Sequence, residues 1–256
     1  MNGKLYPFLL FLCLTIFTSS NAAAQSLFGG KHSVSKMPER GIVVVLGGGV
    51  TAVKSNICGS PSCNEFGPNV SVGALYKMTP YLGVSGQVDY ARLGATEKGP
   101  QRPLNISFRS EVIGVTGTAV VNLLDSYAGG FGYRSLRKRF IVPYARVGAG
   151  FVYYTPTSFP GQGDLQDSQV TYDPARKYPA LAVVIPFGGG LKFRLNDEFS
   201  VATELMYHIT TTDYLDNIGP ELHPALTKDH YGIASAKLMY TPRIQNKIFS
   251  RKYSRK

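Results

Sequence analysis

The sequence contains no tryptophan, few charged residues and no apolar run long enough for a membrane-spanning helix. Charged residues make up 17% of the 256 residues, against roughly a quarter in ordinary soluble domains. The longest apolar run, residues 5–17, has about 13 residues, whereas a spanning helix needs about 20. It follows Lys4 and precedes the small residues Ala22, Ala23 and Ala24. This order is typical of an export signal, so we predict a signal peptide over residues 1–24 and no transmembrane helix after it.

Cysteine is also scarce, because one of the three, Cys13, lies within the predicted signal. The other two, Cys58 and Cys63, are separated by four residues. In an oxidising envelope this spacing indicates a disulfide that pinches a loop tip. A metal site is the alternative, but no third or fourth ligand lies nearby in the sequence. We therefore predict a disulfide, no metal site and no cofactor.

Glycine and aromatic residues are abundant, and apolar and polar residues alternate in many segments. In residues 81–93, Leu82, Val84 and Val88 alternate with Ser85 and Gln87. Such a strand has one apolar and one polar face. Residues 41–53 are apolar on both faces, so the phase of that strand stays open. A change of phase near Glu111 predicts a β-bulge there. The pattern predicts strands at residues 41–53, 69–78, 81–93, 113–123, 141–153, 181–195, 199–211 and 231–240.

The predicted fold class is all-β: an eight-stranded antiparallel transmembrane β-barrel over residues 41–240. A periplasmic segment, residues 25–40, would precede it, and a basic periplasmic tail, residues 241–256, would follow. Connections at Thr79-Pro80 and Asn196-Asp197 are short, and those at residues 54–68, 94–103, 155–179 and 212–229 are long. Bacterial barrels keep short turns in the periplasm and long loops outside. We therefore predict the outer membrane of a Gram-negative bacterium, with both termini periplasmic.

Several charged residues fall on the polar, inward face of the predicted strands. Side chains fill the interior of a barrel with only eight strands, so these charges predict a salt-bridged plug and no open channel. The residues of this lumen charge network are Lys77, Asp89, Arg146, Lys192, Arg194, Glu204 and Lys237.

An enzymatic site needs consideration, because some membrane barrels modify lipids. Glu204 and His208 point inward from one strand, but four strand residues separate them by roughly 13 Å. Neither has an adjacent serine nucleophile in the sequence, so we predict no enzyme and a structural His208. The glycine triplets at residues 47–49 and 188–190 lack the helix and lysine of a phosphate loop. They indicate close packing within strands.

Positive charge gathers in the segments predicted to be periplasmic. Removing the signal, with Lys4, changes the net charge from +11 to +10. The cations could bind phosphates of the inner leaflet, or they could dock an acidic periplasmic partner; the compartment excludes nucleic acid. The residues concerned are Arg134, Arg137, Lys138, Arg139, Arg243, Lys247, Arg251, Lys252, Arg255 and Lys256.

Four segments resemble a known family in order and spacing: residues 102–109 (RPLNISFR), 143–150 (PYARVGAG), 185–197 (IPFGGGLKFRLND) and 212–217 (TDYLDN). They are similar to the small Bacteroidota outer-membrane barrels that include PorG of the type IX secretion apparatus. The likeness covers roughly residues 41–217. Asn217 stands where the family often has a second aspartate. The most specific element is the run Thr212, Asp213, Tyr214, Leu215 and Asp216.

The resemblance implies a non-catalytic outer-membrane component that holds a periplasmic secretion ring, made of a lipoprotein and its partner, against the membrane. The first alternative is a general structural or adhesion barrel of the OmpA/OmpX type that works through its long outer loops. The second is a lipid-modifying enzyme or a transporter of small amphiphiles. Outer-membrane lipids and lipopolysaccharide are expected partners.

Overall fold

A computed structural model describes residues 41–55, 57–58, 61–97, 106–124, 139–161, 176–218 and 228–242. The predicted signal peptide, the segment 25–40 and the tail from residue 243 lie outside the described residues. Within them no helix has the length and apolar character needed to cross a membrane. The elements are β1 (Gly41–Lys54), the 3-10 helix η1 (Pro61–Cys63), β2 (Gly67–Lys77), β3 (Leu82–Thr96), β4 (Ile106–Asn122), β5 (Ile141–Pro160), β6 (Ala180–Arg194), β7 (Phe199–Thr210) and β8 (His230–Tyr240).

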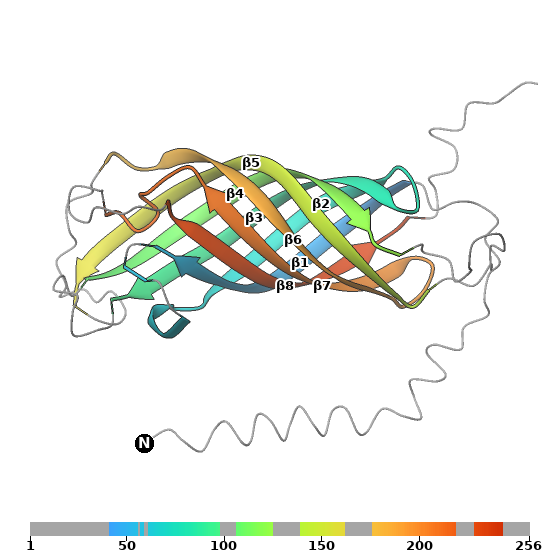
Figure 1. The fold of residues 1–256 in the computed structure, drawn as a ribbon, viewed down its shortest axis with the longest axis horizontal. Helices are drawn as coiled ribbons and strands as arrows, with labels where there is room; N and C mark the ends of the chain where they lie inside the picture. The colour runs from blue at the N-terminus through green and yellow to red at the C-terminus, as the bar shows by residue number, and fades with distance from the viewer. Residues whose placement is uncertain are drawn as a thin grey trace, which may run out of the picture.

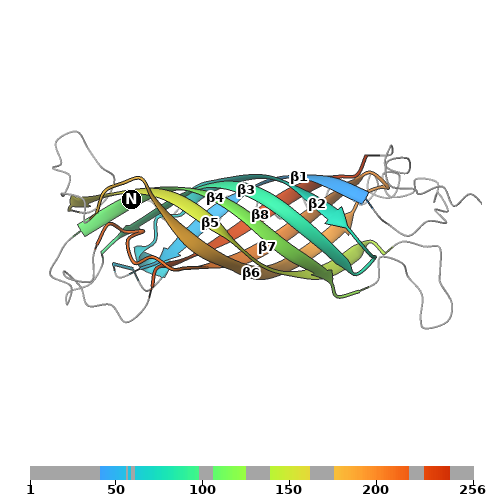
Figure 2. The same ribbon diagram turned by 90° about the horizontal axis from the view of Figure 1, so that it is seen from above.

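The strands form a closed barrel in which each strand pairs antiparallel with the next one in sequence. Figures 1 and 2 show the strands winding obliquely around one long axis. β1 closes the barrel against β8, with a register that runs from Val44 opposite Tyr240 to Lys54 opposite His230. Closure leaves no unpaired sheet edge, as a strand surrounded by hydrocarbon requires. The predicted fold class and strand order are confirmed.

Two short connections lie at one end of the barrel together with a longer one at residues 123–140, and the other four connections lie at the opposite end. At the short-turn end, residues 78–81 join β2 to β3 and residues 195–198 join β6 to β7. Thr79 Oγ1 accepts a hydrogen bond from the Leu82 N–H at 2.9 Å, and Asn196 Oδ1 accepts one from the Glu198 N–H at 2.9 Å. Side chains that bond the backbone two or three residues on stabilise such turns. At the opposite, long-loop end lie the connections after β1, β3, β5 and β7.

The outward face of each strand carries exposed apolar side chains, and the inward face is buried. On β3, for example, Leu82, Val84 and Val88 are exposed, whereas Ser85 and Asp89 are buried. The structure also resolves the open phase of β1, whose even-numbered residues from Ile42 to Val50 face outward. This apolar belt spans nine positions on three of the strands, from Ile42 to Val50 on β1, from Leu82 to Tyr90 on β3 and from Ile113 to Val121 on β4. That is about the length a tilted strand needs to cross a bilayer.

Three strands continue beyond the belt at the long-loop end, which corrects the predicted boundaries. β3 continues to Thr96, not residue 93, β4 begins at Ile106, not at residue 113, and β5 continues to Pro160, not residue 153. The predicted bulge near Glu111 is wrong, because β4 pairs without interruption from Ile106 to Asn122 with β5 and from Ser107 to Val121 with β3. Side chains keep alternating inward and outward through this point. What changes is which face is apolar: the outward face within the belt, and the inward face beyond it. Beyond the belt, Glu111 faces outward and Val112 is buried inside.

The glycine triplets occupy places where neighbouring backbones approach closely. A Cβ added to Gly49 would lie 2.1 Å from the carbonyl oxygen of Ala234, and one added to Gly190 would lie 2.0 Å from that of Thr203. Both contacts are to the backbone of the paired strand, so no side-chain rotation can relieve them. Close packing within strands, the interpretation drawn from the sequence, agrees with these contacts.

Gly49→Ala is therefore expected to destabilise the barrel by roughly 1–3 kcal/mol, since β1 and β8 must separate locally to admit the methyl group. Gly48→Ala is the matched control, because its nearest neighbour is 3.7 Å away. Urea unfolding in detergent micelles measures both variants. Equal stability of the two would contradict the proposed backbone clash.

Candidate functional site

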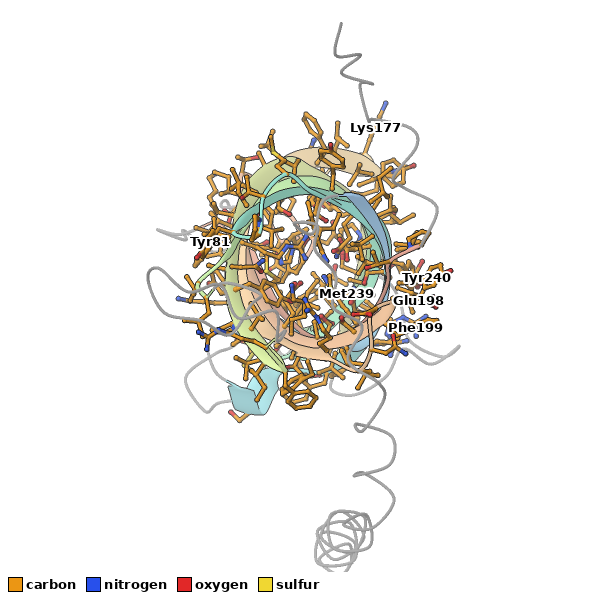
Figure 3. The ribbon with its side chains drawn as sticks, turned by 90° about the vertical axis from the view of Figure 1, so that its right-hand side faces the viewer. Tyr81, Lys177, Glu198, Phe199, Met239 and Tyr240 are labelled. Carbon is orange, nitrogen blue, oxygen red and sulfur yellow. A yellow bond between two sulfur atoms is a disulfide. The ribbon has the colours of Figure 1, made fainter. Side chains whose placement is uncertain are left out.

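The interior of the barrel consists of two apolar layers with a polar layer between them. The apolar layer at the short-turn end contains Val43, Leu75, Val120 and Tyr144, with Met239 packed against it. Figure 3, viewed along the barrel, shows Met239 directed inward while Tyr81 and Tyr240 lie on the outside. The second apolar layer lies at the long-loop end and includes residues of β1, β3, β4, β5, β6 and β8. Charged side chains in the middle are thus separated from water at both ends.

Glu204 is the centre of the polar layer and receives hydrogen bonds from three side chains. Arg146 Nη1 lies 2.8 Å from Glu204 Oε2 and 3.0 Å from Oε1. Lys237 Nζ donates to Oε1, and the Tyr144 hydroxyl donates to Oε2 at 2.8 Å. Only 1% of the Glu204 side chain is exposed, against 6% for Arg146 and 4% for Lys237. A buried carboxylate with two cationic partners satisfies the requirement that buried charge be paired and hydrogen-bonded.

A second acid, Asp89, balances the second cation of this layer. Gln87 joins the two halves: its Nε2 donates to Asp89 Oδ1, and its Oε1 accepts from Lys237 Nζ at 2.7 Å. Arg146 Nη2 also donates to Thr118 Oγ1 at 2.8 Å. The cavity that remains among these residues has a volume of about 10 Å³, enough for at most a single water. The layer is a filled plug.

The structure thus brings together four of the seven charges predicted for the lumen. The other three lie closer to the short-turn end: Lys192 is buried opposite Ala202, while Lys77 and Arg194 are the last residues of β2 and β6. Tyr144, Gln87 and Thr118 were not part of the predicted network. The alternation of apolar and polar residues along their strands already places all three side chains on the inward face. Their place inside the barrel could therefore have been predicted from the sequence.

His208 is buried and has a structural contact. Its ring stacks on that of Tyr231 with centroids 4.4 Å apart and planes 4° from parallel. His208 and Glu204 line the same small cavity, which has no room for a substrate. Within the described interior, this pair therefore offers no site for lipid chemistry.

The segment after β7, residues 212–218, folds back into the barrel at the long-loop end and forms a second plug. Leu215 and Ile218 are buried in the apolar layer there. The Thr212 hydroxyl lies 2.8 Å from that of Tyr154, and Asn217 Nδ2 donates to Ser158 Oγ at 2.8 Å. Asn217 has φ of 62°, a left-handed conformation that asparagine tolerates better than most residues. We call residues 212–218 the mouth segment.

Two fully buried aspartates hold the mouth segment. Asp216 Oδ1 accepts the Ile218 N–H at 3.0 Å, and Asp229 Oδ2 accepts the Leu215 N–H at 2.9 Å. The remaining oxygens, Asp216 Oδ2 and Asp229 Oδ1, have no partner among the described residues. Burial raises the pKa of Asp216 to about 7; burial and the nearby Asp216 raise the pKa of Asp229 to about 9.

Arg176, which precedes β6 in the chain, lies over the mouth segment. The guanidinium carbon of Arg176 lies 5.2 Å from the centroid of the Tyr214 ring, a cation–π geometry. Tyr154 and Tyr178 meet edge to face, with ring centroids 6.0 Å apart. Burial raises the pKa of the Tyr178 hydroxyl. Four of the five residues in the most specific run of the sequence, Thr212 to Asp216, are buried, which gives this run a structural role.

Comparison with known proteins identifies the family. A model of the outer membrane protein beta-barrel domain matches residues 9–223, most of the chain. The chain belongs to this family. No curated protein sequence matches it.

Solved structures with the same fold are outer-membrane barrels of low sequence identity. Neisserial surface protein A is 14% identical, with 78% of this chain and 96% of that one covered and a TM-score of 0.42. Ail of Yersinia pestis, solved with the heparin analogue sucrose octasulfate, is 15% identical, with 79% and 99% covered and a TM-score of 0.43. OprG of Pseudomonas aeruginosa is 9% identical, with 80% and 99% covered and a TM-score of 0.36. At these values the likenesses carry no argument about function.

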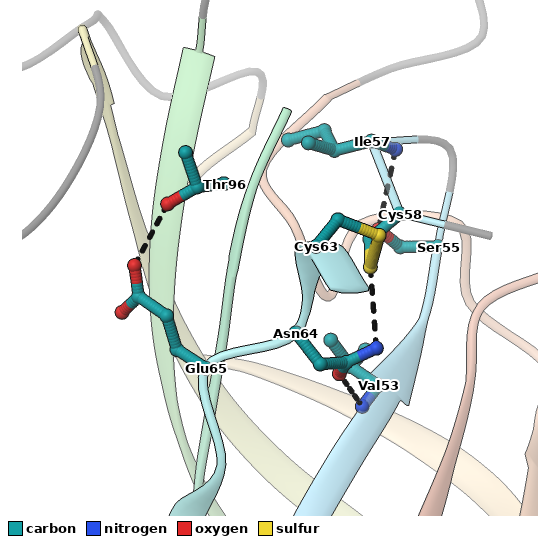
Figure 4. Close-up of a disulfide and its surroundings, with 8 residues drawn as sticks. All are labelled: Val53, Ser55, Ile57, Cys58, Cys63, Asn64, Glu65 and Thr96. Carbon is teal, nitrogen blue, oxygen red and sulfur yellow. Dashed lines mark hydrogen bonds between the residues drawn. A yellow bond between two sulfur atoms is a disulfide. The ribbon is translucent and has the colours of Figure 1, made fainter. Parts of the chain in front are cut away.

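In this outer-membrane barrel the two cysteines form the predicted disulfide, with Cα atoms 5.6 Å apart. Figure 4 shows how Asn64 fastens it: Nδ2 donates to Cys58 Sγ at 3.2 Å, and Oδ1 accepts the Val53 N–H at 2.6 Å. Both cysteines are buried in the apolar layer at the long-loop end. The disulfide lies within the connection between β1 and β2, as predicted. It is buried because this loop packs against the end of β3, where Asn64 bridges to Ala95 and the Glu65 N–H bonds the Gly94 carbonyl oxygen.

The predicted periplasmic contact residues lie almost entirely outside the described residues. Arg139, one residue before Phe140 at the short-turn end, is described. The remaining nine, at positions 134–138 and 243–256, are not, so their contacts stay a prediction.

Proposed function

We propose that this protein is a structural or surface-binding barrel of the outer membrane that does not conduct solutes and acts through its two ends. The observation that supports this proposal best is the layered interior. The Arg146–Glu204–Lys237 layer leaves room for at most one water, and the mouth segment covers it. A barrel used for transport would need a continuous polar path, and the described interior has none.

Conductance across a planar lipid bilayer tests the closed state. The purified protein is expected to give no steady current. A variant with Arg146, Glu204 and Lys237 all changed to alanine should also stay closed, because the lost side chains leave a cavity only in the middle layer and the apolar layers on both sides of it remain. Steady channel conductance by the unmodified protein would contradict the proposal.

We also propose that the short-turn end faces the periplasm and the long-loop end the exterior, as the turn lengths favour. The native cysteines of the mature chain are paired, so an introduced cysteine gives a single reactive thiol. Lys177→Cys should react with an impermeant maleimide on intact cells, and Thr79→Cys only after the outer membrane is opened. The reverse labelling pattern would invert the proposed orientation.

A second candidate function is anchoring of a periplasmic secretion ring, as the resemblance to PorG-like barrels implies. It has support in the placement of the basic segments. Gly41, Leu124, Arg139 and Pro242 all lie at the short-turn end, so the segments 25–40, 125–138 and 243–256 are all attached to that end. The nine basic residues of the last two segments, together with Arg139, could form one docking surface for an acidic partner.

Changing Arg134, Arg137, Lys138 and Arg139 together to glutamate tests this candidate. It predicts loss of co-purifying ring lipoprotein and partner from membranes, with the barrel still folded. Unchanged co-purification would discard the anchoring role. Normal export of type IX cargo in a deletion strain would favour the general structural or adhesion role instead.

A further inference from the structure

A groove opens on the outside of the barrel, away from the interior plug and the mouth segment. It has a volume of about 440 Å³ and lies where the start of β2 meets β3 and β4. Phe66, Arg92 and Arg109 line it, together with Glu65. The proposed function uses none of these residues, and of the four only Arg109 lies in a segment that carries the resemblance.

The groove lies just outside the apolar belt, at the long-loop end. On β3 the outward residues are apolar up to Tyr90, and the next outward residue is Arg92. On β4 the last apolar residue of the outer face is Ile113. The next residues of that face toward the long-loop end are Glu111 and Arg109. Such a boundary is where lipid headgroups lie when the acyl chains contact the belt.

An exposed aromatic ring lines the groove. Phe66 immediately precedes β2, and 65% of its surface is exposed. Gly67, the first residue of β2, packs directly on the β3 backbone, since a Cβ there would lie 1.9 Å from the Arg92 carbonyl oxygen. This close contact fixes Phe66 beside Arg92. The groove therefore presents an apolar ring and a guanidinium group side by side.

The acidic neighbours do not neutralise Arg92 fully. Glu65 Oε1 accepts a hydrogen bond from Thr96 at 2.7 Å. Glu111 Oε1 accepts one from Tyr90 at 3.1 Å and lies 3.5 Å from Arg92 Nη2, with 43% of the Arg92 and 55% of the Glu111 side chain exposed. A long, exposed pair of this kind contributes little. Arg92 Nε is buried without a hydrogen-bond partner within the described part of the chain.

We propose that this groove binds the phosphorylated headgroup of an acylated glycolipid of the outer leaflet. Arg92 and Arg109 would bind the phosphate, because the planar guanidinium donates pairs of hydrogen bonds to phosphate oxygens. Phe66, at the level of Gly94 and thus farther from the belt than Arg92, would pack against the apolar face of the headgroup sugar. The inference rests on the proposed orientation of the barrel and is independent of any partner at the short-turn end.

The absence of tryptophan from the chain makes a direct test possible. Phe66→Trp places a single tryptophan in the groove, and its fluorescence is recorded while diphosphorylated lipid A is added to the protein in detergent micelles. We expect a saturable change. With Arg92→Ala and Arg109→Ala added, binding should be roughly tenfold weaker or more, from the loss of two charged contacts.

Matched controls separate the groove from general charge. Lys54→Ala with Lys177→Ala removes two cations from the same end of the barrel and should leave binding unchanged. Arg92→Lys with Arg109→Lys keeps the charge and should bind with intermediate affinity. Native mass spectrometry of the protein with Phe66 intact checks that the lipid adduct does not depend on the reporter, and circular dichroism confirms that each variant is folded.

Several results would overturn the proposal. Equal binding of dephosphorylated lipid A, or unchanged binding after both arginines are removed, would exclude phosphate recognition at the groove. An identical fluorescence change with inorganic phosphate alone would assign the groove to free phosphate and not to lipid. Binding in micelles together with reversed cysteine labelling on cells would leave the groove intact and refute the orientation instead.

Discussion

Glu204→Gln should destabilise the folded barrel by about 3–5 kcal/mol, the cost of leaving a buried charge uncompensated. The carboxylate accepts hydrogen bonds from Arg146, Lys237 and Tyr144 inside a layer closed by apolar side chains on both sides. Glutamine has nearly the same shape, but it offers one acceptor oxygen and no negative charge. Arg146 and Lys237 would then face each other with Asp89 as the nearest remaining acid of the layer.

Urea unfolding of the reconstituted protein measures the loss of unfolding free energy. Two further variants test whether this loss comes from the uncompensated charge. Lys237→Met in the Glu204→Gln background removes the excess cation and should restore most of the stability, because the layer becomes neutral again. Glu111→Gln removes an exposed acid from a long ion pair and should change stability by no more than about 1 kcal/mol. If Glu204→Gln cost as little as Glu111→Gln, the polar layer would not hold the barrel together.

The strands and the polar layer could be predicted from the sequence because both depend on local alternation. In the bilayer one face must be apolar, so Asp89, Arg146, Glu204 and Lys237 can only face inward. Their convergence on Glu204 depends on strand tilt and register, which bring β3, β5, β7 and β8 to one level. Alternation gives the face of each residue but not its height along the barrel axis.

The ends of the strands could not be predicted by the same rule. Above the belt the outward face meets water, so Glu111 is outside while Phe108 and Val112 are buried inside. A rule that requires apolar residues on the outer face of a strand predicts a break in the alternation near Glu111. A rule that also accepts apolar residues on the inner face and charged ones on the outer face would have extended β4 to Ile106.

The position of the mouth segment could not be predicted either, because it depends on contacts between residues far apart in the sequence. Leu215 is held by Asp229, and Asn217 by Ser158. The sequence showed that residues 212–217 resemble a specific run in related barrels but not that they fold inward. Two aspartates within a hydrophilic loop would ordinarily be expected on the surface.

Raising the pH from 5 to 8 should loosen the mouth segment. The pKa of Asp216 is raised to about 7 and that of Asp229 to about 9 by burial, from an ordinary value near 4. The closed form therefore holds protons that the open, solvated form releases. Stability of the closed form is complete below about pH 4 and falls as the pH rises through 7. Between these limits, each such proton changes the opening equilibrium by about tenfold per pH unit.

Hydrogen exchange of the Leu215 and Ile218 amides, which donate to Asp229 and Asp216, measures this opening once the intrinsic rate at each pH is subtracted. Asp216→Asn with Asp229→Asn mimics the protonated pair, keeps an acceptor for each amide, and should remove most of the pH dependence. Arg176→Lys keeps a cation beside Tyr214 and should leave the slope unchanged. Protection that stays the same from pH 5 to 8 would contradict the prediction, because carboxylates already ionised in the closed form release no proton on opening. The mouth segment would then need cationic partners from the loops to stay closed.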